Sequence, residues 1–469
     1  MRIHLIELRD GRMGLASQRV NSLMLPILAV WAERVGWEAR VSFTELADVD
    51  YAHACDVVAL SLYTFLAPGG YAVARRFREQ GRLVIIGGPH TKGCIDEVTE
   101  HADLVFDRCD ESVWCETLRA IEHGAIVPRP GRGRFVPSPE MTRVPPYRAL
   151  KPFYGTGKIP LLLSSLGCPH DCDFCTDWNS SYHKRDVDEV IEDVREIQAP
   201  FFIFCDPNFG VNRRFTTELL KRMVPLGKQY MMETSLAWLL HDDYLALLRD
   251  SGCIGIELGL ESLTTTYGKN GIKGVDAPVG EIVQRIARIK RYIPLIQVNI
   301  LLGLDNDTGE TFRAVADLYR RANIDELVPF VVTPFPGTPF FDRLRAEGRL
   351  FETDWRHFNC ANLVLLPRQL SVPAFYDLYM DLLRRLHAPG LVARKVLTHL
   401  RQYRDAKLAV ILLAFLLARA WNTFRHHLPE LRIDKRRAQA RAAQAGVRAD
   451  AILGLDPPRV DAGSVVAVG

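Results

Sequence analysis

The chain has little net charge, few cysteines and no apolar run long enough for a clear membrane span. Its 59 Lys and Arg nearly balance its 56 Asp and Glu, and this balance gives no reason to expect a nucleic-acid partner. The longest apolar run, residues 408–421, is shorter than the roughly 20 residues that cross a bilayer. No secretory signal is recognisable, and ten irregularly spaced cysteines are too few for a disulfide scaffold. These absences predict a globular protein of the reducing cytoplasm.

The order of segments predicts an α/β fold at the N-terminal end. The chain has 469 residues, 48% hydrophobic and 25% charged, which suits two to four globular domains. Within residues 1–125, helix-like segments alternate with short apolar runs at 3–8, 56–63, 82–88 and 102–106. Continuous apolar runs are typical of parallel strands buried on both faces. We therefore predict a doubly wound, flavodoxin-like parallel sheet with ligand sites beyond the carboxyl ends of its strands.

A second β/α block follows a linker. Residues 126–155 are dense in Pro, Gly and Arg and mark the predicted linker. Residues 156–345 then contain six strand-like runs separated by helical patterns: 159–165, 201–206, 230–236, 254–260, 295–304 and 327–335. This alternation predicts a partial (β/α)6 barrel, in which site residues come from the carboxyl ends of the strands.

The remainder of the chain is predicted to be helical and then poorly ordered. Residues 346–430 form the predicted helical C-terminal region, with Ser371 as an N-cap and a break between helices at 388–390. The apolar run 408–421 has two interpretations, a buried core helix or a contact with a membrane or a lipid-like substrate. Core packing is the more common case. Residues 431–469 are basic and then rich in Gly, Val and Ala, which predicts a flexible tail.

Three of the ten cysteines crowd into the loop after the first barrel strand. Cys168, Cys172 and Cys175 form the pattern C-x-x-x-C-x-x-C. A structural zinc site takes four ligands, and no second pair lies nearby. Buried thiols without a function would not gather on a loop of Gly, Pro and Asp. An iron–sulfur cluster held by three thiolates fits the spacing better, and it leaves one iron without a protein ligand. Zinc and incidental thiols remain the alternatives.

In this setting the motif resembles the radical S-adenosylmethionine (SAM) superfamily, and Phe174 before the last cysteine fits the resemblance. The resemblance implies a [4Fe-4S] cluster on the three cysteines, with SAM bound to the open iron through its amino and carboxylate groups. It also implies an external electron donor such as flavodoxin or ferredoxin. Reductive cleavage of SAM would give a 5′-deoxyadenosyl radical that abstracts hydrogen from an unactivated carbon.

The ends of the later barrel strands resemble the cobalamin-binding branch of this superfamily. Asp206 and Asn208 stand where many members have Gly-Gly-Glu to hold the methionyl amino group of SAM. The resemblance gives further cofactor-binding residues: Glu261, Ser262, Asn299, Gly303 and Pro336. Pro334, Pro336 and Gly337 would shape the turn at the end of the sixth strand. Taken singly, Asp206 could cap the next helix and Glu261 could pair with a buried arginine. Their order along successive strand ends is what carries the resemblance.

The first domain resembles the cobalamin-binding module of the same branch. The resemblance puts the corrin edge against two loops, where glycine would let the backbone approach a flat macrocycle: Ser61, Leu62, Tyr63, Gly87, Gly88, Pro89 and His90. Two features depart from the family pattern. The domain has no D-x-H-x-x-G motif to supply a lower cobalt ligand, and Arg-Cys-Asp-Glu at 108–111 replaces Gly-Glu-Gly-Glu. We predict His90 to be a loop residue rather than a metal ligand.

The resemblance therefore predicts a radical SAM enzyme that depends on cobalamin and methylates an unactivated carbon of a small-molecule or lipid-like substrate. One SAM molecule would remethylate cobalamin and a second would yield the radical. The alternative within the superfamily is cyclisation, ring rearrangement or oxidation in a natural-product, porphyrin or lipid pathway. The alternative outside it is a non-catalytic iron–sulfur or zinc protein.

Overall fold

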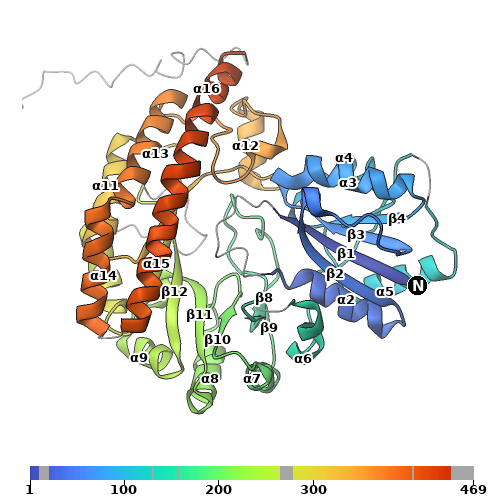
Figure 1. Ribbon diagram of the computed structural model, residues 1–469, viewed down its shortest axis with the longest axis horizontal. Helices are drawn as coiled ribbons and strands as arrows, with labels where there is room; N and C mark the ends of the chain where they lie inside the picture. Colours follow the sequence, from blue (N-terminus) through green and yellow to red (C-terminus); the bar gives the residue numbers. More distant parts are fainter. Residues whose placement is uncertain (10–20, 129–130, 156–157, 265–277, 404–405, 445–469) are drawn as a thin grey trace, which may run out of the picture.

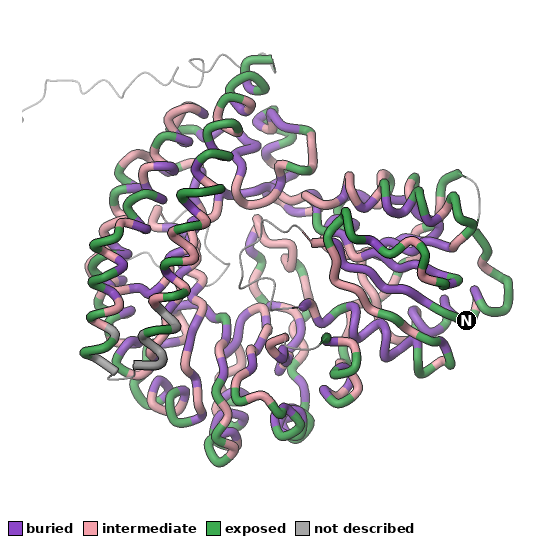
Figure 2. Tube along the Cα trace, in the orientation of Figure 1, coloured by how far each residue is buried: buried purple, intermediate pink, exposed green. Residues whose placement is uncertain are grey.

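A computed structural model of the chain describes residues 1–9, 21–128, 131–155, 158–264, 278–403 and 406–444 (Figure 1). These residues form a six-stranded parallel sheet near the N-terminus, a second six-stranded parallel sheet, and a group of long helices at the C-terminal end. The strands of both sheets are largely buried, while exposed residues recur along the outer helices (Figure 2). The α/β fold predicted from the sequence, a doubly wound sheet followed by a partial barrel and helices, is confirmed.

The first sheet has the strand order β2-β1-β3-β4-β5-β6, whose first five strands follow the flavodoxin-like order. The predicted apolar runs are four of its strands: β1 (Arg2–Arg9), β3 (Val57–Ser61), β4 (Leu83–Gly87) and β5 (Leu104–Val105). The sequence did not reveal β2 (Glu38–Glu45), because this edge strand is half exposed and has no continuous apolar run. The short β6 (Arg134–Phe135) lies inside the predicted linker.

Helices cover both faces of the first sheet. On one face, α2 (Met24–Arg34) and α5 (Glu111–Glu122) bury Trp31 and Trp114 against β1, β3 and β4. On the other face, α3 (Ala67–Glu79) and α4 (Ile95–Thr99) bury Phe77 and Val98. Because both faces are covered by helices, a ligand can reach this sheet at the carboxyl ends of its strands, as in other doubly wound folds.

All six predicted barrel strands are confirmed. They are β7 (Leu161–Leu162), β10 (Phe201–Phe204), β11 (Gln229–Ser235), β12 (Cys253–Glu261), β13 (Leu295–Leu302) and β14 (Glu326–Val331). They pair in parallel in the order β14-β13-β12-β11-β10-β7. The intervening helices are α7 (Val187–Glu196), α8 (Arg213–Met223), α9 (Asp242–Asp250), α10 (Val279–Ile289) and α11 (Gly309–Arg321).

Burial alternates along the barrel strands. In β13, Ile296, Val298 and Ile300 are fully buried, whereas Gln297 and Asn299 between them are half-buried. Successive strand side chains point to opposite faces of a sheet, so the apolar set meets the helices and the polar set lines the barrel interior. The polar side chains that this fold offers to a ligand therefore lie inside the barrel and at its strand ends.

The C-terminal region continues past the boundary predicted from the sequence. It contains α12 (Pro339–Ala346), α13 (Val372–Leu386), α14 (Pro389–Tyr403), α15 (Ala406–Asn422), a π-helical turn (Thr423–His427) and α16 (Leu428–Gln444). Ser371 is the N-cap of α13, since its hydroxyl accepts from the Ala374 amide at 3.3 Å. The predicted tail begins instead as α16, because Leu431, Ala438 and Ala442 are buried beside α13. Residues 445–469 of that tail lie outside the described residues.

No helix in the described part of the chain combines the length and the apolar composition needed to cross a bilayer. This includes α15, which carries much of the apolar run 408–421.

Lys395 of α14 connects the C-terminal helices to the barrel, and the free energy needed to bury its side chain depends on pH. Its ammonium group donates to the Ile324 carbonyl and lies 3.7 Å from the centre of the Tyr319 ring. Burial lowers the pKa of Lys395 to about 7. Because the unfolded lysine titrates near 10.4, the unfolded chain binds more protons between about pH 7 and pH 10. Stability should therefore rise with pH across this window and be lost again as pH falls toward 7.

We expect Lys395→Met to remove this rise. The wild-type chain should gain about 2 kcal/mol of unfolding free energy relative to the variant between about pH 7.5 and pH 9.5. Denaturant unfolding of both chains at the two pH values measures the difference. Parallel pH profiles for the two chains would show that Lys395 carries no such cost.

Candidate active site

The three cysteines lie on one loop, between β8 (Ser165–Leu166) and β9 (His183–Lys184), directly after the first barrel strand. Cys168 and Cys172 are buried and Cys175 is half-buried, and none of the three forms a disulfide. Thiolates are the ligands that iron–sulfur clusters take in proteins. The donor set, three thiols on a turn at the carboxyl end of a barrel strand, therefore fits such a cluster.

The loop is closed on itself by backbone contacts. Gly167 has a φ of +65°, and a Cβ there would lie 2.1 Å from the Ser181 carbonyl oxygen. The Cys168 amide donates to the Ser180 hydroxyl at 3.0 Å, which joins the two ends of the loop. The Cys175 sulfur accepts from the Asp177 amide at 3.4 Å. Hydrogen bonds to ligating sulfurs stabilise the thiolate and shift the potential of a bound cluster.

The turn between β14 and α12 holds the cysteine loop from the barrel side. Trp178 donates from its indole nitrogen to the Gly337 carbonyl at 2.6 Å. The Asp173 carbonyl accepts from the Phe340 amide at 2.9 Å, and its carboxylate pairs with Arg343 at 2.8 Å. Two of the residues predicted to shape the sixth-strand end, Pro334 and Pro336, are buried in this same turn.

The first domain reaches the same place through the 3-10 turn Pro89–Lys92 that follows β4. Lys92 donates from Nζ to the Thr176 carbonyl in the cysteine loop at 2.7 Å. The next residue, Gly93, touches the backbone of the β14–α12 turn, since a Cβ on it would lie 2.1 Å from both the Gly337 nitrogen and the Pro336 carbonyl carbon. Three segments from strand ends of both sheets thus meet. We call residues 89–93, 167–181 and 334–338 the junction.

The close approach at Gly93 predicts a sensitive position. Adding one methyl group in Gly93→Ala forces the two backbones apart, because the obstructing atoms are main chain and cannot rotate away. We expect a loss of about 2 kcal/mol in unfolding free energy and a weaker association of the first domain with the barrel. Denaturant unfolding and limited proteolysis of the intact chain measure these effects. Gly390→Ala is the matched control, because a Cβ there meets nothing within 4 Å. Equal behaviour of the two variants would contradict the packing described.

Asp206, predicted to hold the amino group of SAM, is almost fully buried and faces the end of the neighbouring strand β7. One carboxylate oxygen accepts from the Ser164 amide at 2.7 Å. The other accepts from the hydroxyls of Ser164 and Ser165 at 2.5 and 2.6 Å. Burial raises the pKa of Asp206, and the three donors oppose that rise. Asp206 does not cap the next helix, since Asn212 caps α8 by accepting from the Phe215 amide.

Asn208 joins the next pair of strand ends. It is buried, accepts from the Ser235 amide at 3.2 Å and donates to the Ser235 hydroxyl at 3.3 Å. Ser235 ends β11, so Asn208 ties the loop after β10 to that strand. Asp206 and Asn208 together fix the carboxyl ends of β7, β10 and β11 beside the cysteine loop.

Glu261, at the end of β12, has a strained backbone. Its φ is +63°, and the pairing with β13 shifts register between Gly259 and Glu261. A left-handed non-glycine residue at a bulge is uncommon, and bulges often re-aim a side chain near a site. A Cβ on Gly259 would lie 2.7 Å from the Glu261 carboxylate, so glycine at 259 leaves room for it. The adjacent Ser262 is buried, and its hydroxyl accepts from the Thr264 amide at 3.0 Å.

Asn299 belongs to a polar strip inside the barrel. It donates to the Glu257 carboxylate at 2.5 Å and accepts from Gln297 at 3.1 Å. Glu326 of β14 pairs with Arg419 of α15 at 2.7 Å, and burial raises the pKa of this glutamate. The amide of Asn299 is thus held in one orientation, and a helix of the C-terminal region supplies a charge to the barrel interior.

Gly303 and Phe174 complete the predicted barrel set. Gly303, with a φ of +97°, directly follows β13 and donates to the Asp307 carboxylate at 2.8 Å. A Cβ on Gly303 would lie 3.2 Å from the Phe375 ring of α13, so this glycine packs against the C-terminal region. Burial raises the pKa of Asp307 to about 6. Phe174 is half-buried and packs on the barrel core next to the cysteines.

The two predicted corrin loops of the first domain are hydrogen-bonded to each other. The Leu62 amide donates to the Gly87 carbonyl at 2.9 Å, and the His90 amide donates to the Leu62 carbonyl at 3.1 Å. Gly88 has a φ of +106°, and a Cβ on it would lie 2.6 Å from the Leu62 nitrogen. The neighbouring loop of the protein itself therefore requires glycine at this position. Ser61 and Pro89 are half-buried at the same sheet edge.

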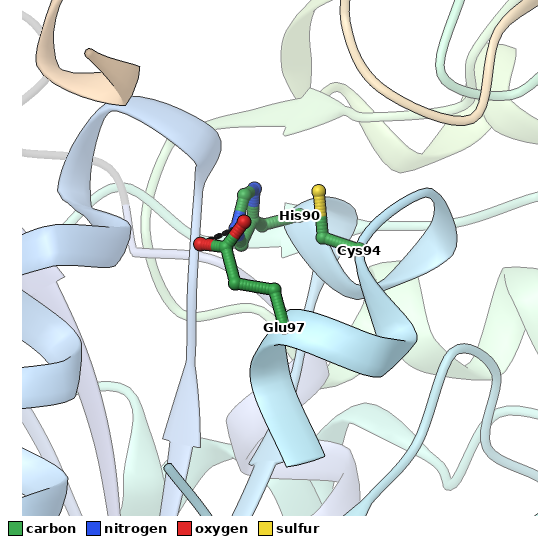
Figure 3. A group of neighbouring side chains, drawn as sticks. All are labelled: His90, Cys94 and Glu97. Atoms are coloured by element: carbon green, nitrogen blue, oxygen red, sulfur yellow. Dashed lines mark ion pairs between the residues drawn. The ribbon is translucent and has the colours of Figure 1, made fainter. Parts of the chain in front are cut away.

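His90 and Cys94, both buried, form a cluster with the half-buried Glu97, shown in Figure 3, and the potential ligand atoms all lie within 4.8 Å of one another. Tyr71 lies 2.9 Å from His90 Nε2 and donates to Glu97 at 2.8 Å, while Trp355 donates to Glu97 at 3.0 Å. Burial raises the pKa of Cys94 to about 12, which keeps the thiol protonated at neutral pH when no metal ion is bound. The cluster works as a hydrogen-bonded link between the first domain and the segment around Trp355.

The substituted segment 108–111 serves as a connector. Arg108 pairs with Glu140 at 3.1 Å, and Glu140 accepts from the Ser181 amide of the cysteine loop at 2.8 Å. Asp110 is the N-cap of α5, and Glu111 pairs with Arg34. Arginine at 108 thus adds another tie between the first domain and the junction.

Several residues of the site were not predicted from the sequence. Lys92 and Gly93 make contacts across the junction, and Ser164 and Ser165 donate to Asp206, but each belongs to a residue type that is common in loops. Only the position of Ser164 and Ser165 could have identified them as site residues, because they follow an apolar strand immediately before the cysteine motif.

A known sequence family matches the region that contains the cysteine loop and the barrel strands. The Radical SAM superfamily matches residues 162–319, which run from β7 to within α11. Together with the cysteine loop and the partial barrel, this match assigns residues 162–319 to the radical SAM superfamily as a radical SAM domain.

Relatives and solved structures agree with this placement. The chain is 27% identical to bacteriochlorophyllide d C-12(1)-methyltransferase of Chlorobaculum tepidum over 358 residues, 73% of this chain and 76% of the relative. It is 28% identical to hopanoid C-2 methylase of Rhodopseudomonas palustris over 245 residues, 49% and 45% of the two chains.

Two solved structures share the fold. The radical SAM methyltransferase TsrM from Kitasatospora setae, with cobalamin and a [4Fe-4S] cluster bound, has a TM-score of 0.59 at 16% identity and covers 74% of this chain and 75% of its own. The cobalamin-dependent radical enzyme OxsB, with aqua-cobalamin and SAM bound, has a TM-score of 0.58 at 10% identity. That likeness covers 97% of this chain and 81% of OxsB, so the arrangement of both sheets and the C-terminal helices is shared.

Proposed function

We propose that this enzyme is a cobalamin-dependent radical SAM methyltransferase that acts on an unactivated carbon of a hydrophobic, polycyclic substrate. The observation that carries the proposal is the junction, where strand-end loops of the first sheet contact the cysteine loop of the barrel. Ligands of parallel α/β folds bind beyond the carboxyl ends of the strands. A cofactor bound at the first sheet would therefore lie beside a cluster bound at the second.

In this proposal residues 1–125 bind cobalamin and residues 156–345 bind the cluster and SAM. Residues 346–430, continued by α16, help to shape the barrel mouth. When bound, the cluster and SAM supply a radical that takes hydrogen from an unactivated carbon, and cobalamin supplies a methyl group. Cys168, Cys172 and Cys175 hold the cluster. The reaction would need an external one-electron donor. We place the protein in the reducing cytoplasm, because none of its ten cysteines forms a disulfide.

The chain's own residues fit the roles of holding and orienting these groups. Glu261 and Asn299 present a carboxylate and an oriented amide at the barrel mouth and interior, where the polar parts of SAM would be held. Asp206 acts as a positioning residue, because its oxygens are bonded to Ser164 and Ser165. Ser61, Leu62, Gly87, Gly88 and Pro89 form the sheet edge that would face the corrin.

The substrate class rests on the relatives. The names of two of them specify methylation of bacteriochlorophyllide d and of a hopanoid, both hydrophobic ring systems. A hydrophobic polycyclic substrate is the chemistry that these relatives have in common. An anaerobic magnesium-protoporphyrin IX monomethyl ester cyclase of Cereibacter sphaeroides, 28% identical over 276 residues, favours the second candidate, a cyclase.

Anaerobic reconstitution tests the proposal. The full chain, supplied with iron, sulfide, hydroxocobalamin, reductant and SAM, should take up corrin in a one-to-one ratio and form 5′-deoxyadenosine. With a hopanoid or a chlorophyllide as substrate, it should also form S-adenosylhomocysteine and a product heavier by one methylene group. Formation of 5′-deoxyadenosine without corrin uptake would replace methyl transfer with the cyclase candidate.

A further inference from the structure

Exposed apolar side chains gather on the C-terminal helices. Fourteen large hydrophobic side chains are exposed among the residues that the structure describes, and seven of them lie between residues 397 and 433. Elsewhere they are scattered singly, which is normal for a protein surface. A concentration of this kind usually marks an interaction site.

Four of the seven form one stripe along α15 and the turn that follows. Val410, Leu417, Trp421 and Phe424 are 64%, 54%, 67% and 44% exposed. Their spacing of seven, four and three residues places them on one side of a helix. Figure 1 shows α16 continuing the line of α15, which runs beside α14, and Figure 2 shows exposed residues recurring along these helices. We call these four side chains the α15 stripe.

The opposite face of α15 explains how the helix is held. Leu416 is 2% exposed and forms a small apolar cluster with Val392 of α14 and Leu295 of β13. Arg419 turns inward to Glu326 in the barrel. The sequence-based preference for core packing is therefore right for this face only, and the apolar outer face has no partner within the described chain.

The charge around the stripe is almost entirely positive. Residues 389–429 contain seven Lys or Arg and a single acidic residue, Asp405; two of the seven, Lys395 and Arg419, turn inward to the barrel, which leaves five against one. Arg394, Arg401 and Arg425 are exposed, and the Arg425 guanidinium lies 5.9 Å from the centre of the Trp421 ring. An apolar face bordered by arginine and bearing an exposed tryptophan is typical of helices that lie in the headgroup region of an anionic membrane.

We propose that the α15 stripe docks on an anionic phospholipid surface, with the helix lying in the plane of the interface. The positive border selects phospholipids of negative charge, and the stripe enters the boundary between headgroups and acyl chains. A surface contact agrees with the helix lengths, since no described helix spans a bilayer. The proposal stands apart from methyl transfer, because docking needs neither cluster nor corrin. If both hold, the enzyme would collect a hydrophobic substrate at the membrane where such molecules partition.

Cosedimentation of the full chain with vesicles tests the docking. Vesicles of phosphatidylglycerol and phosphatidylethanolamine should bind the protein, and vesicles of phosphatidylcholine alone should bind it far less. High salt should weaken the binding, because it screens the arginines. The double variant Leu417→Gln/Trp421→Gln should lower the partition coefficient about tenfold or more, since it removes two large apolar side chains from the contact. The tryptophan fluorescence of the wild-type chain should shift to the blue on binding, and that of the variant should not.

The matched control is Val224→Gln/Leu240→Gln, which changes two exposed apolar residues outside the stripe and should bind as the wild type does. All exchanged side chains are exposed, so circular dichroism and iron loading should be unchanged. Three results would overturn the proposal: no binding of the wild type to anionic vesicles, equal binding of variant and wild type, or a stripe-dependent dimer in sedimentation that does not bind vesicles. The last result would assign the stripe to a second copy of the chain.

Discussion

Replacing Cys172 with alanine should abolish iron binding and SAM cleavage while leaving the fold intact. Cys172 is 1% exposed at the centre of the cysteine loop, and a cluster with three protein ligands loses one of them. We expect 5′-deoxyadenosine formation to fall at least about 1,000-fold, which corresponds to about 4 kcal/mol in transition-state free energy. Iron and sulfide analysis after anaerobic reconstitution, followed by chromatography of the nucleoside product, measures both effects.

Cys115→Ala is the control for this experiment. Cys115 is also a buried free thiol, but it lies on α5 in the first domain, away from the junction. Its replacement should preserve iron content and SAM cleavage. If Cys172→Ala binds as much iron as wild type and cleaves SAM at the same rate, the cysteine loop does not hold the cluster.

Asp206→Ala should lower both the stability of the chain and the rate of SAM cleavage, because Asp206 holds the strand end that precedes the cysteine loop. The substitution leaves the Ser164 amide and two serine hydroxyls in a buried place without their acceptor. Unpaired buried donors cost about 1–3 kcal/mol each without being additive, so we expect a total near 3 kcal/mol. The end of β7 leads into the cysteine loop, and a misplacement of about 1 Å at a reacting centre can cost about 100-fold in rate. Denaturant unfolding and 5′-deoxyadenosine assays measure the two losses.

A second pair of variants separates positioning from SAM binding. Under the positioning account, Ser164→Ala/Ser165→Ala removes the two hydroxyl contacts of Asp206 and keeps the Ser164 amide contact. It should reproduce much of the Asp206→Ala effect, with kcat lowered and KM for SAM little changed. Asp250→Ala, at an exposed surface pair, should change neither. If Asp206→Asn instead raises KM for SAM about tenfold while the serine variant remains active, the carboxylate binds the SAM amino group directly.

Strands buried on both faces were predictable from the sequence, because their continuous apolar runs stand out from the helices. Four of the six strands in the first sheet and all six in the barrel were found in this way. The edge strand β2 was missed since one of its sides faces solvent and its pattern is mixed. Residues 431–444 were taken for a tail because charge dominates their composition. Only the packing of Leu431, Ala438 and Ala442 beside α13 makes them a helix.

The chemistry of the site was predictable where spacing encodes it, as in the cysteine motif. Contacts between distant segments were not. The partner of Asp206 is a pair of ordinary serines on another strand, and Gly93 matters through its approach to Gly337 in another domain. The turn glycine Gly88 also lies against Leu62 of the neighbouring loop, a contact that no local pattern reveals. These roles depend on contacts between residues that are far apart in the sequence, and such contacts cannot be predicted from one sequence alone.

The central claim is that the three-cysteine loop holds a cluster with one open iron that binds SAM. The most direct test is electron paramagnetic resonance of the full chain, reconstituted anaerobically and reduced, before and after addition of SAM. We predict about four irons per chain, a reduced cluster signal that changes when SAM is added, and release of 5′-deoxyadenosine. Stoichiometric zinc without iron, or a reduced cluster whose signal ignores SAM and leaves it uncleaved, would contradict the account.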